Sequence, residues 1–197
     1  MKVIGITGGV GCGKSMVMDL IREHFNAYVI KADDVGKNVL NQGTSGYEQV
    51  VALFGEEILM ESGEINRNRL AEIVFHEPNK RMDLNSIVHP QVKKRIVEEM
   101  ARIRCEEKYD FFVVEAALLL EDHYEVFCDE VWYVYAEKEQ RKKRLMESRG
   151  YSPEKIEKIM ESQLDEEEFR KRCDFVLDNS KSRQDTLNQL KKMLVVD

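Results

Sequence analysis

The sequence contains few cysteines and no long apolar run. Its 197 residues include four cysteines, which form neither a CxxC pair nor a Cys/His ligand spacing. This pattern predicts neither a zinc site nor a disulfide framework. No apolar stretch approaches the roughly 20 residues of a membrane span, and the first residues lack a signal-peptide pattern. We therefore expect a cytoplasmic protein without a membrane partner.

Positive charge is also in deficit. The chain has 30 lysines and arginines against 37 aspartates and glutamates, which gives a formal net charge of −7. Nucleic acids and anionic membranes bind basic surfaces, so this balance argues against a nucleic-acid partner. A site for an anionic ligand must draw on positive charge gathered locally. The sequence predicts neither a monomer nor a particular oligomer.

Short apolar segments alternate with helical patterns along the chain. The segments lie at residues 3–7, 28–30, 111–114, 131–135 and 175–177. They lack polar alternation, which is typical of strands buried on both faces of a parallel sheet. We therefore predict an α/β fold with a parallel sheet of about five strands. The stretch 48–104 is helical in pattern and too long for a simple crossover, so we expect it to be an insertion on the ligand side.

Residues 8–15 match the pattern G-x-x-x-x-G-K-[ST] at every fixed position, between the first strand and a helix. Glycines let backbone N–H groups turn toward phosphates, and the helix N-terminus adds partial positive charge. Lys14 would reach the β- and γ-phosphates, and the Ser15 hydroxyl would bind Mg²⁺. A glycine-rich turn with a coincidental Lys-Ser pair is the alternative. The expected nucleotide-binding residues are Gly8, Gly9, Val10, Gly11, Cys12, Gly13, Lys14, Ser15 and Met16.

The motifs of a GTPase switch are not met. Residues 33–36 fit D-x-x-G only formally, because they follow the second strand too soon, and residues 79–83 miss N-K-x-D by one position. A kinase instead needs a base for the acceptor hydroxyl. Asp33 ends the second strand, where its carboxylate could accept that proton or hold Mg²⁺ through water. The alternative is that Asp33 caps the next helix.

Basic residues gather after the fourth expected strand. Between residues 137 and 149 there are six basic and three acidic residues. This segment is where a helical lid over the nucleotide is expected, with Arg141 and Arg144 on one helix face and Arg149 near the helix end. A solvated basic face is the alternative. Gln163 falls on the apolar stripe of a later helix, where it either forms a hydrogen bond within the lid or lies at its rim.

Taken in order, these residues resemble the dephospho-CoA kinase family over nearly the whole chain. The chain departs from the family pattern in four ways: Lys31 replaces an aspartate, Ala117 replaces a proline, Cys173 stands where alanine is usual, and one extra residue separates Gln140 from Arg144. The matching motifs lie at residues 5–9, 13–15, 31–33, 69–75, 89–90, 117–121, 140–149, 163 and 174–179.

The resemblance implies a three-layer P-loop kinase fold. It implies ATP-dependent phosphorylation of the ribose 3′-hydroxyl of dephospho-CoA, the last step of coenzyme A synthesis, with ATP as co-substrate and Mg²⁺. The alternatives are a kinase of another nucleotide or small hydroxyl acceptor, and a non-catalytic ATP-binding regulator. The expected parts are a nucleotide-binding core at 1–47, 105–136 and 173–197, a helical acceptor region at 48–104 and a lid at 137–172.

The resemblance also implies roles for single residues. Asp33, together with Lys14, Arg144 and Arg149, would be catalytic, with Asp33 as the base and the two arginines closing over the phosphoryl group. The residues implied to bind or shape the site of dephospho-CoA are Asp33, Arg69, His89 and Leu118, and Asn179 is implied to lie near the adenine of ATP. Two purely structural alternatives stay open: Arg69 pairs with Glu72 on the surface, and His89 is a residue at the start of a helix.

Overall fold

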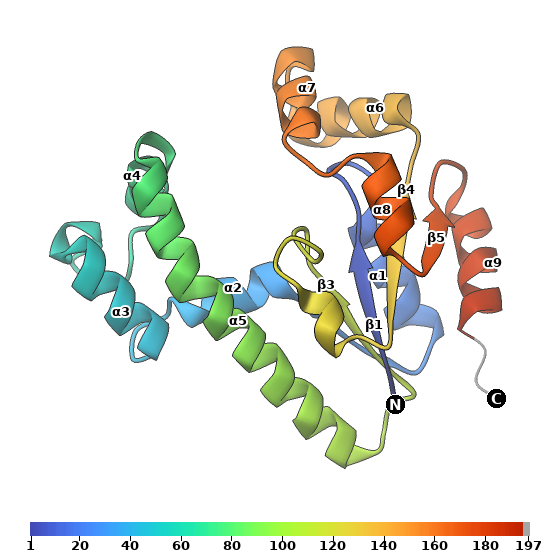
Figure 1. The fold of residues 1–197 in the computed structure, drawn as a ribbon, viewed down its shortest axis with the longest axis horizontal. Coiled ribbons are helices and arrows are strands. Elements are labelled where there is room, and N and C mark those ends of the chain that lie inside the picture. Colours follow the sequence, from blue (N-terminus) through green and yellow to red (C-terminus); the bar gives the residue numbers. More distant parts are fainter. Residues whose placement is uncertain (195–197) are drawn as a thin grey trace. The chain divides into compact units, whose positions relative to one another are not determined.

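The computed structural model describes residues 1–194 (Figure 1). The chain divides into two compact units. Residues 1–30 and the chain from 102 onward form the first, called here the sheet unit, and residues 31–101 form the second, the helical unit. The expected core segment 173–197 ends in residues 195–197, which lie outside the described residues.

The sheet unit is built on five strands. They pair in the order β2-β3-β1-β4-β5, and β1 runs parallel to both β3 and β4. Ile4 of β1 lies opposite Val113 in the register of this pairing. The prediction of a parallel sheet of about five strands is confirmed. The strands are β1 (Lys2–Thr7), β2 (Ala27–Lys31), β3 (Phe111–Glu115), β4 (Glu130–Tyr135) and β5 (Phe175–Asp178).

Burial explains why the central strands carry almost no polar side chains. Every residue of β3 is buried, as are five of the six residues of β1. Helices α1 (Lys14–His24) and α9 (Arg183–Met193) lie beside each other against the sheet and contribute Val17, Ile21 and Leu190 to its core (Figure 1). Burial of such side chains contributes roughly 1.5–3 kcal/mol each to folding. The apolar strands therefore form a rigid base for the loop between β1 and α1.

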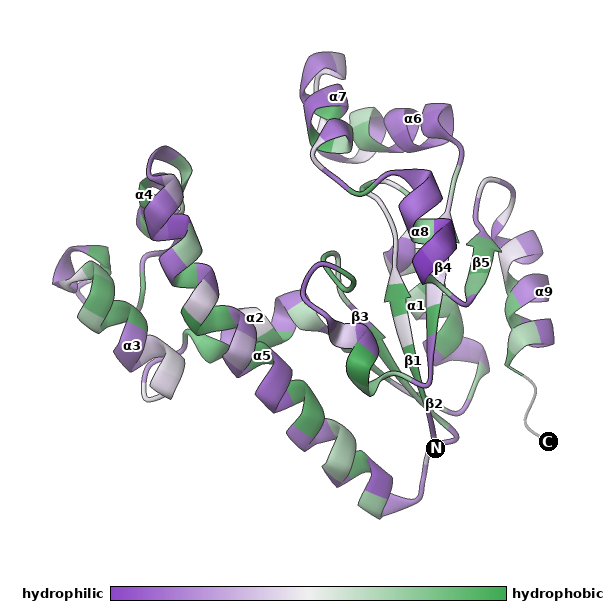
Figure 2. Cartoon of the chain, viewed as in Figure 1, coloured by the Kyte–Doolittle hydropathy of each residue, from purple (hydrophilic) through white to green (hydrophobic). Residues whose placement is uncertain are grey.

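Three helices follow β4 in the expected lid segment: α6 (Lys138–Arg149), α7 (Pro153–Glu161) and α8 (Glu166–Arg172). Gly150 ends α6 in the left-handed conformation, with φ of 62°, and the Ser152 side chain then caps α7. The Glu157 carboxylate of α7 pairs with Lys142 at 2.6 Å and with Lys138 at 3.0 Å. These ion pairs hold α6 and α7 together. Figure 2 shows hydrophilic residues over much of α6 and α8 and hydrophobic residues along the strands.

The helical unit has a hydrophobic core of its own. Its buried residues are Val50, Phe54, Ile58, Ile65, Leu70 and Ile73. The side chains of Thr44 and Asn66 cap α3 and α4, each by accepting a backbone N–H of the first turn. The helices are α2 (Ala32–Val39), α3 (Ser45–Phe54), α4 (Arg67–His76) and α5 (Pro78–Glu106), with 3-10 turns at Glu56–Ile58 in this unit and at Tyr124–Phe127 in the sheet unit.

Two features of the helical unit differ from the sequence-based expectation. The helical unit starts at residue 31, so α2 and the loop after it belong to it, whereas the acceptor region was expected to start at 48. Helix α5 runs through Pro90. The alternative interpretation of His89 as a helix-start residue is therefore wrong, because His89 lies inside α5. Among residues 1–194, no helix is long and apolar enough to cross a membrane.

Candidate nucleotide-binding site

The glycine-rich loop between β1 and α1 adopts a backbone that only glycine tolerates well. Gly11 and Gly13 have φ of 77° and 94°. A Cβ atom at Gly11 would lie 2.8 Å from the Arg141 carbonyl oxygen, and one at Gly13 would overlap the Asn179 amide. The glycines at these two positions of the motif are therefore required by the loop conformation and by its close neighbours.

Helix α1 presents an uncapped N-terminus at the end of this loop. No side chain caps it, and its first turn contains no acidic residue. Free N–H groups and the helix dipole favour an anion at such a position. Lys14 begins the helix and folds back along the loop, where its Nζ donates a hydrogen bond to the Gly8 carbonyl at 2.6 Å. The loop and the lysine thus gather positive charge at one place, as the motif predicted.

Helix α6 and the segment after α7 contact the loop at Val10. Arg141 Nε donates a hydrogen bond to the Val10 carbonyl at 2.8 Å, and Gln163 Oε1 accepts one from the Val10 N–H at 2.8 Å. Arg141 Nη2 also donates to Gln163 Oε1 at 3.4 Å. Of the two sequence-based alternatives for Gln163, the structure therefore supports the hydrogen-bonded one, although the bond extends beyond the lid to the loop.

Arg144 and Asn179 hold the second half of the loop. Arg144 donates from Nη1 to the Cys12 carbonyl at 3.2 Å and from Nη2 to the Asn179 carbonyl at 2.8 Å. Asn179 is 1% exposed, and its Nδ2 donates to the same Cys12 carbonyl at 2.7 Å. Its Oδ1 accepts from Thr186, and its N–H donates to the Tyr135 carbonyl. Each polar group of Asn179 therefore has a protein partner, so the residue fixes the loop in place. Its proximity to the adenine of ATP stays a prediction.

The two arginines predicted to close over the phosphoryl group differ in position. Arg144 lies against the loop, whereas Arg149 is exposed at the end of α6, with its guanidinium 5.9 Å from the centre of the Tyr151 ring. Arg141 was not among the predicted catalytic residues, yet it contacts the loop directly. Its spacing of three residues from Arg144, which places both on one helix face, was the signal available in the sequence.

Asp33 lies in the first turn of α2 and is exposed. The N-cap residue of α2 is Lys31 and no side chain caps the helix, so the interpretation of Asp33 as the helix cap is wrong. The neighbouring Asp34 pairs with Lys37 at 2.6 Å, and this partner holds the pKa of Asp34 below its usual value. The Asp33 side chain has no hydrogen-bond or ion-pair partner among residues 1–194. Its carboxylate is thus available to a ligand.

The other predicted acceptor residues lie on α4, on α5 and in the turn after β3. Arg69 of α4 pairs with Glu72 at 3.5 Å, as the surface alternative predicted, and both line a cavity of about 430 Å³. His89 lies within α5 in the helical unit, and Leu118, 47% exposed, follows β3 in the sheet unit. Their predicted contacts with the acceptor stay predictions.

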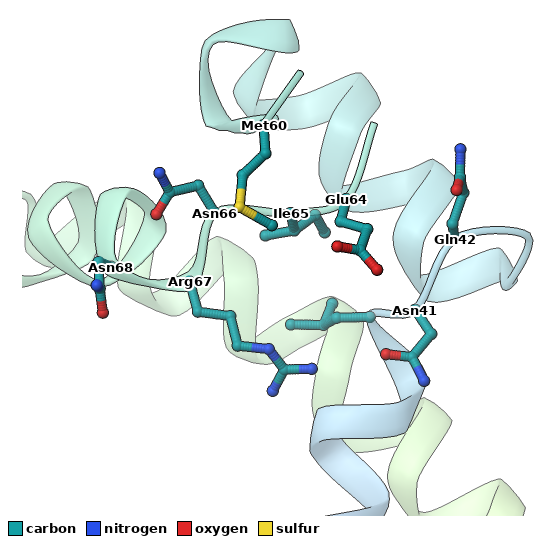
Figure 3. A pocket seen from close by; sticks show the side chains of 9 residues that line it. Asn41, Gln42, Met60, Glu64, Ile65, Asn66, Arg67 and Asn68 are labelled. Carbon is teal, nitrogen blue, oxygen red and sulfur yellow. The ribbon is translucent and has the colours of Figure 1, made fainter. Parts of the chain in front are cut away.

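The helical unit also contains a larger polar cavity that the sequence did not signal. Its volume is about 610 Å³, and Figure 3 shows Asn41, Glu64 and Arg67 directed toward it. Arg67 is fixed by a hydrogen bond of 2.7 Å from Nη2 to the Lys37 carbonyl. The lining residues are Leu40, Asn41, Gln42, Met60, Glu64, Ile65, Asn66, Arg67 and Asn68.

The residues around the loop fit a magnesium ion that binds together with a nucleotide. The Ser15 hydroxyl is exposed in the first turn of α1 and supplies the hard oxygen donor that Mg²⁺ prefers. Within the described part of the chain there is no cluster of three or more His, Cys, Asp or Glu side chains able to hold a metal alone. A Mg²⁺ ion here would therefore take most of its ligands from phosphate oxygens and water.

The comparisons with known proteins agree with this geometry. The family model of dephospho-CoA kinase (CoaE) matches residues 2–185. A dephospho-CoA kinase of Listeria innocua is 38% identical over 96% of this chain and 94% of its own, and one of Carboxydothermus hydrogenoformans is 36% identical over 98% and 93%.

Solved structures give the same result. A dephospho-CoA kinase from Campylobacter jejuni has a TM-score of 0.72 at 29% identity, and the match covers 98% of both chains. TT1252 from Thermus thermophilus has a TM-score of 0.81 at 32% identity, and the match covers 98% of this chain and 96% of the other. A shikimate kinase from Acinetobacter baumannii, at 10% identity with a TM-score of 0.57, shares the fold; it covers 98% of this chain and 93% of its own. The chain belongs to the dephospho-CoA kinase family.

Proposed function

We propose that this protein transfers the γ-phosphoryl group of ATP to the ribose 3′-hydroxyl of dephospho-CoA and so forms coenzyme A. Membership in the dephospho-CoA kinase family supports the choice of acceptor. The single structural observation that carries the kinase chemistry is the glycine loop, with Lys14 folded along it and two arginines of α6 bound to it. The cytoplasmic location stays a prediction.

The loop and α1 would hold the phosphates of ATP. Backbone N–H groups and the helix N-terminus bind oxygen atoms of the phosphates, and Lys14 moves from the Gly8 carbonyl to the β- and γ-phosphates. Ser15 would hold Mg²⁺, which neutralises charge on the phosphates when bound. Arg144 and Asn179 keep the second half of the loop in place through the Cys12 carbonyl. ATP binding therefore depends on a loop that is already fixed.

Asp33 would act as the base toward the acceptor. The 3′-hydroxyl proton moves to the Asp33 carboxylate while the oxygen forms a bond to the γ-phosphorus, and the bond from that phosphorus to the ADP oxygen breaks. An exposed carboxylate without a protein partner suits this role, because no ion pair has to be broken first. Arg69, His89 and Leu118 are proposed to bind the rest of dephospho-CoA. Arg149 is proposed to close over the phosphoryl group.

The experiment that tests this function measures ADP release from Mg²⁺-ATP with dephospho-CoA, AMP, CMP or adenosine offered separately, and identifies the product by mass. We expect transfer to dephospho-CoA alone, with coenzyme A as the product. Transfer to a nucleoside monophosphate would keep the kinase chemistry and refute the acceptor. ATP binding without transfer to any of the four would instead indicate a regulator.

A further inference from the structure

Three cations around the loop have no acidic partner. Lys14, Arg141 and Arg144 form hydrogen bonds to carbonyl or amide oxygens, but within residues 1–194 none of them pairs with a carboxylate. Two lysines of the same helix are paired: Lys142 with Glu157 at 2.6 Å, and Lys143 with Glu147 at 4.0 Å. A half-buried cation without a counterion is costly unless an anion binds beside it.

Among these cations, Arg141 lies on the first half of the loop. A Cβ atom at Gly9 would overlap its guanidinium, so the group lies directly over that residue. Lys14 reaches the carbonyl of Gly8, one position earlier in the chain. The two positive groups therefore lie at adjacent residues, Gly8 and Gly9, at the start of the loop. In this motif the lysine contacts the β- and γ-phosphates.

Arg141 and Arg144 each use two of the five guanidinium N–H groups, but only Arg141 has a terminal nitrogen without any hydrogen bond within residues 1–194. Both terminal nitrogens of Arg144 are used by the carbonyls of Cys12 and Asn179. Arg141 uses Nε and Nη2, and its Nη1 has no hydrogen-bond partner in the described part of the chain. Arg141 can thus donate to a phosphate oxygen without giving up its contact with Val10.

We propose that Arg141 is a catalytic residue that contacts the terminal phosphoryl group of bound ATP, and that Gln163 is its positioning residue. Gln163 Oε1 accepts from both the Val10 N–H and Arg141 Nη2, so one amide oxygen fixes the loop and the guanidinium together. Arg141 then stabilises the charge that spreads over the phosphoryl oxygens during transfer. The proposal rests on the kinase function proposed above.

The test compares the binding of ADP with that of a non-hydrolysable ATP analogue by calorimetry, in the presence of Mg²⁺ and without any acceptor. In Arg141→Ala, we expect affinity for the ATP analogue to fall by about 10- to 100-fold, the usual effect of losing one charged donor, while affinity for ADP stays within about twofold. Because no acceptor is present, this result does not depend on the identity of the acceptor. Equal weakening of both nucleotides would mean that Arg141 only holds the loop, and would overturn the proposal.

Further variants separate positioning from folding. Arg141→Lys keeps the charge and should show a smaller loss of ATP-analogue affinity, so the proposal stays testable if Arg141→Ala does not fold. Gln163→Ala loses the bond from the Val10 N–H, which affects both nucleotides, and the bond from Arg141, which should weaken the analogue a few-fold more than ADP. This selective loss should disappear in the Arg141→Ala background. Lys143→Ala removes a charge from the same helix and should change neither affinity. If Gln163→Ala lowered the affinity for the analogue relative to ADP equally with and without Arg141, its positioning role would be refuted.

Discussion

The side-chain amide of Asn179 donates a hydrogen bond of 2.7 Å to the backbone carbonyl of Cys12, from which it is separated by 167 residues. The bond joins the loop after β1 to the end of β5, on the far side of β4 in the sheet order. Arg144 donates to the same carbonyl. The conformation of the loop therefore depends on the last strand of the sheet as well as on its own glycines.

Replacing Asn179 with alanine should destabilise the protein and weaken nucleotide binding together. The substitution leaves the buried Thr186 hydroxyl without its Asn179 partner and removes one bond to Cys12, so we expect a loss of about 1–3 kcal/mol in the free energy of unfolding. Thermal unfolding with and without ATP measures both effects. Asn188→Ala on α9 is the control, because the exposed Asn188 side chain bonds within residues 1–194 only to Gln184 of the same helix. An unchanged melting temperature in Asn179→Ala would contradict the anchoring role.

The adjacent residues Asp33 and Asp34 offer a matched pair for testing the proposed base. Asp33→Asn should retain ATP affinity and reduce transfer by at least about 100-fold, because the amide cannot accept the acceptor proton. Asp34→Asn breaks only the exposed pair with Lys37 and should leave turnover within about twofold. Steady-state rates with dephospho-CoA and calorimetric ATP titrations distinguish the two. Comparable losses of turnover in both variants would point to a disturbed α2 rather than to a base.

Much of the fold could be predicted because its signals are local. Apolar runs without alternation predicted all five strands, and the motif at residues 8–15 predicted the turn and the start of α1. Local sequence patterns did not predict the features that tertiary packing determines. The alternative interpretation placed a helix start at His89, before Pro90, but the structure continues α5 through both residues. The start of the helical unit at residue 31 likewise depends on packing that no local pattern reveals.

The candidate site was less predictable than the fold. The loop and Lys14 follow from the spacing of the motif and Arg144 from the family resemblance, but the contact of Gln163 with Val10 joins residues 153 positions apart. Arg141 shares a face with Arg144, and only the three-dimensional arrangement shows that its guanidinium lies over Gly9. Distant pairs of this kind are set by how α6 and α7 pack, which a single sequence does not encode in any periodic pattern.

The four cysteines should differ sharply in their reactivity. Burial raises the pKa of the Cys128 and Cys173 thiols to about 12, whereas Cys105 is exposed and Cys12 is buried. Since the thiolate is the reactive form, iodoacetamide at pH 8 should label Cys105 first, and the two thiols of raised pKa at least tenfold more slowly. Mass spectrometry of timed samples measures the order, and labelling in denaturant, where the difference should vanish, is the control.

The same two thiols predict how stability depends on pH. Their pKa values in the folded state lie above the ordinary value of 9.0, so below pH 9 they are neutral in both states and leave stability unchanged. As the pH rises from 9 toward 12 the unfolded chain loses these protons first, and the free energy of unfolding should fall. Denaturant titrations at pH 8 and pH 10 measure this. In the double variant Cys128→Ser/Cys173→Ser, the free energy of unfolding should fall less between pH 8 and pH 10 than in the unsubstituted protein. An equal fall in both proteins would exclude these thiols as its source.

Two buried threonines should respond in opposite directions to the same substitution. Thr7 ends β1 directly before the loop and is fully buried, and its hydroxyl has no hydrogen-bond partner in residues 1–194. Thr7→Val removes this unsatisfied group and should raise the free energy of unfolding by about 1 kcal/mol. Thr186 is equally buried, but its hydroxyl donates to Asn179 Oδ1 at 2.9 Å.

Thr186→Val should therefore lower the free energy of unfolding by about 1–3 kcal/mol, because it leaves the buried Asn179 oxygen without that donor. Urea denaturation of both variants without nucleotide measures the two changes against the unsubstituted protein. Repeating the titrations with Mg²⁺-ATP shows whether the Thr7 hydroxyl gains a partner when the loop is occupied. In that case, Thr7→Val should raise the free energy of unfolding less with nucleotide than without it. If Thr7→Val instead lowered the free energy of unfolding without nucleotide, the Thr7 hydroxyl would already have a hydrogen-bond partner in the nucleotide-free protein.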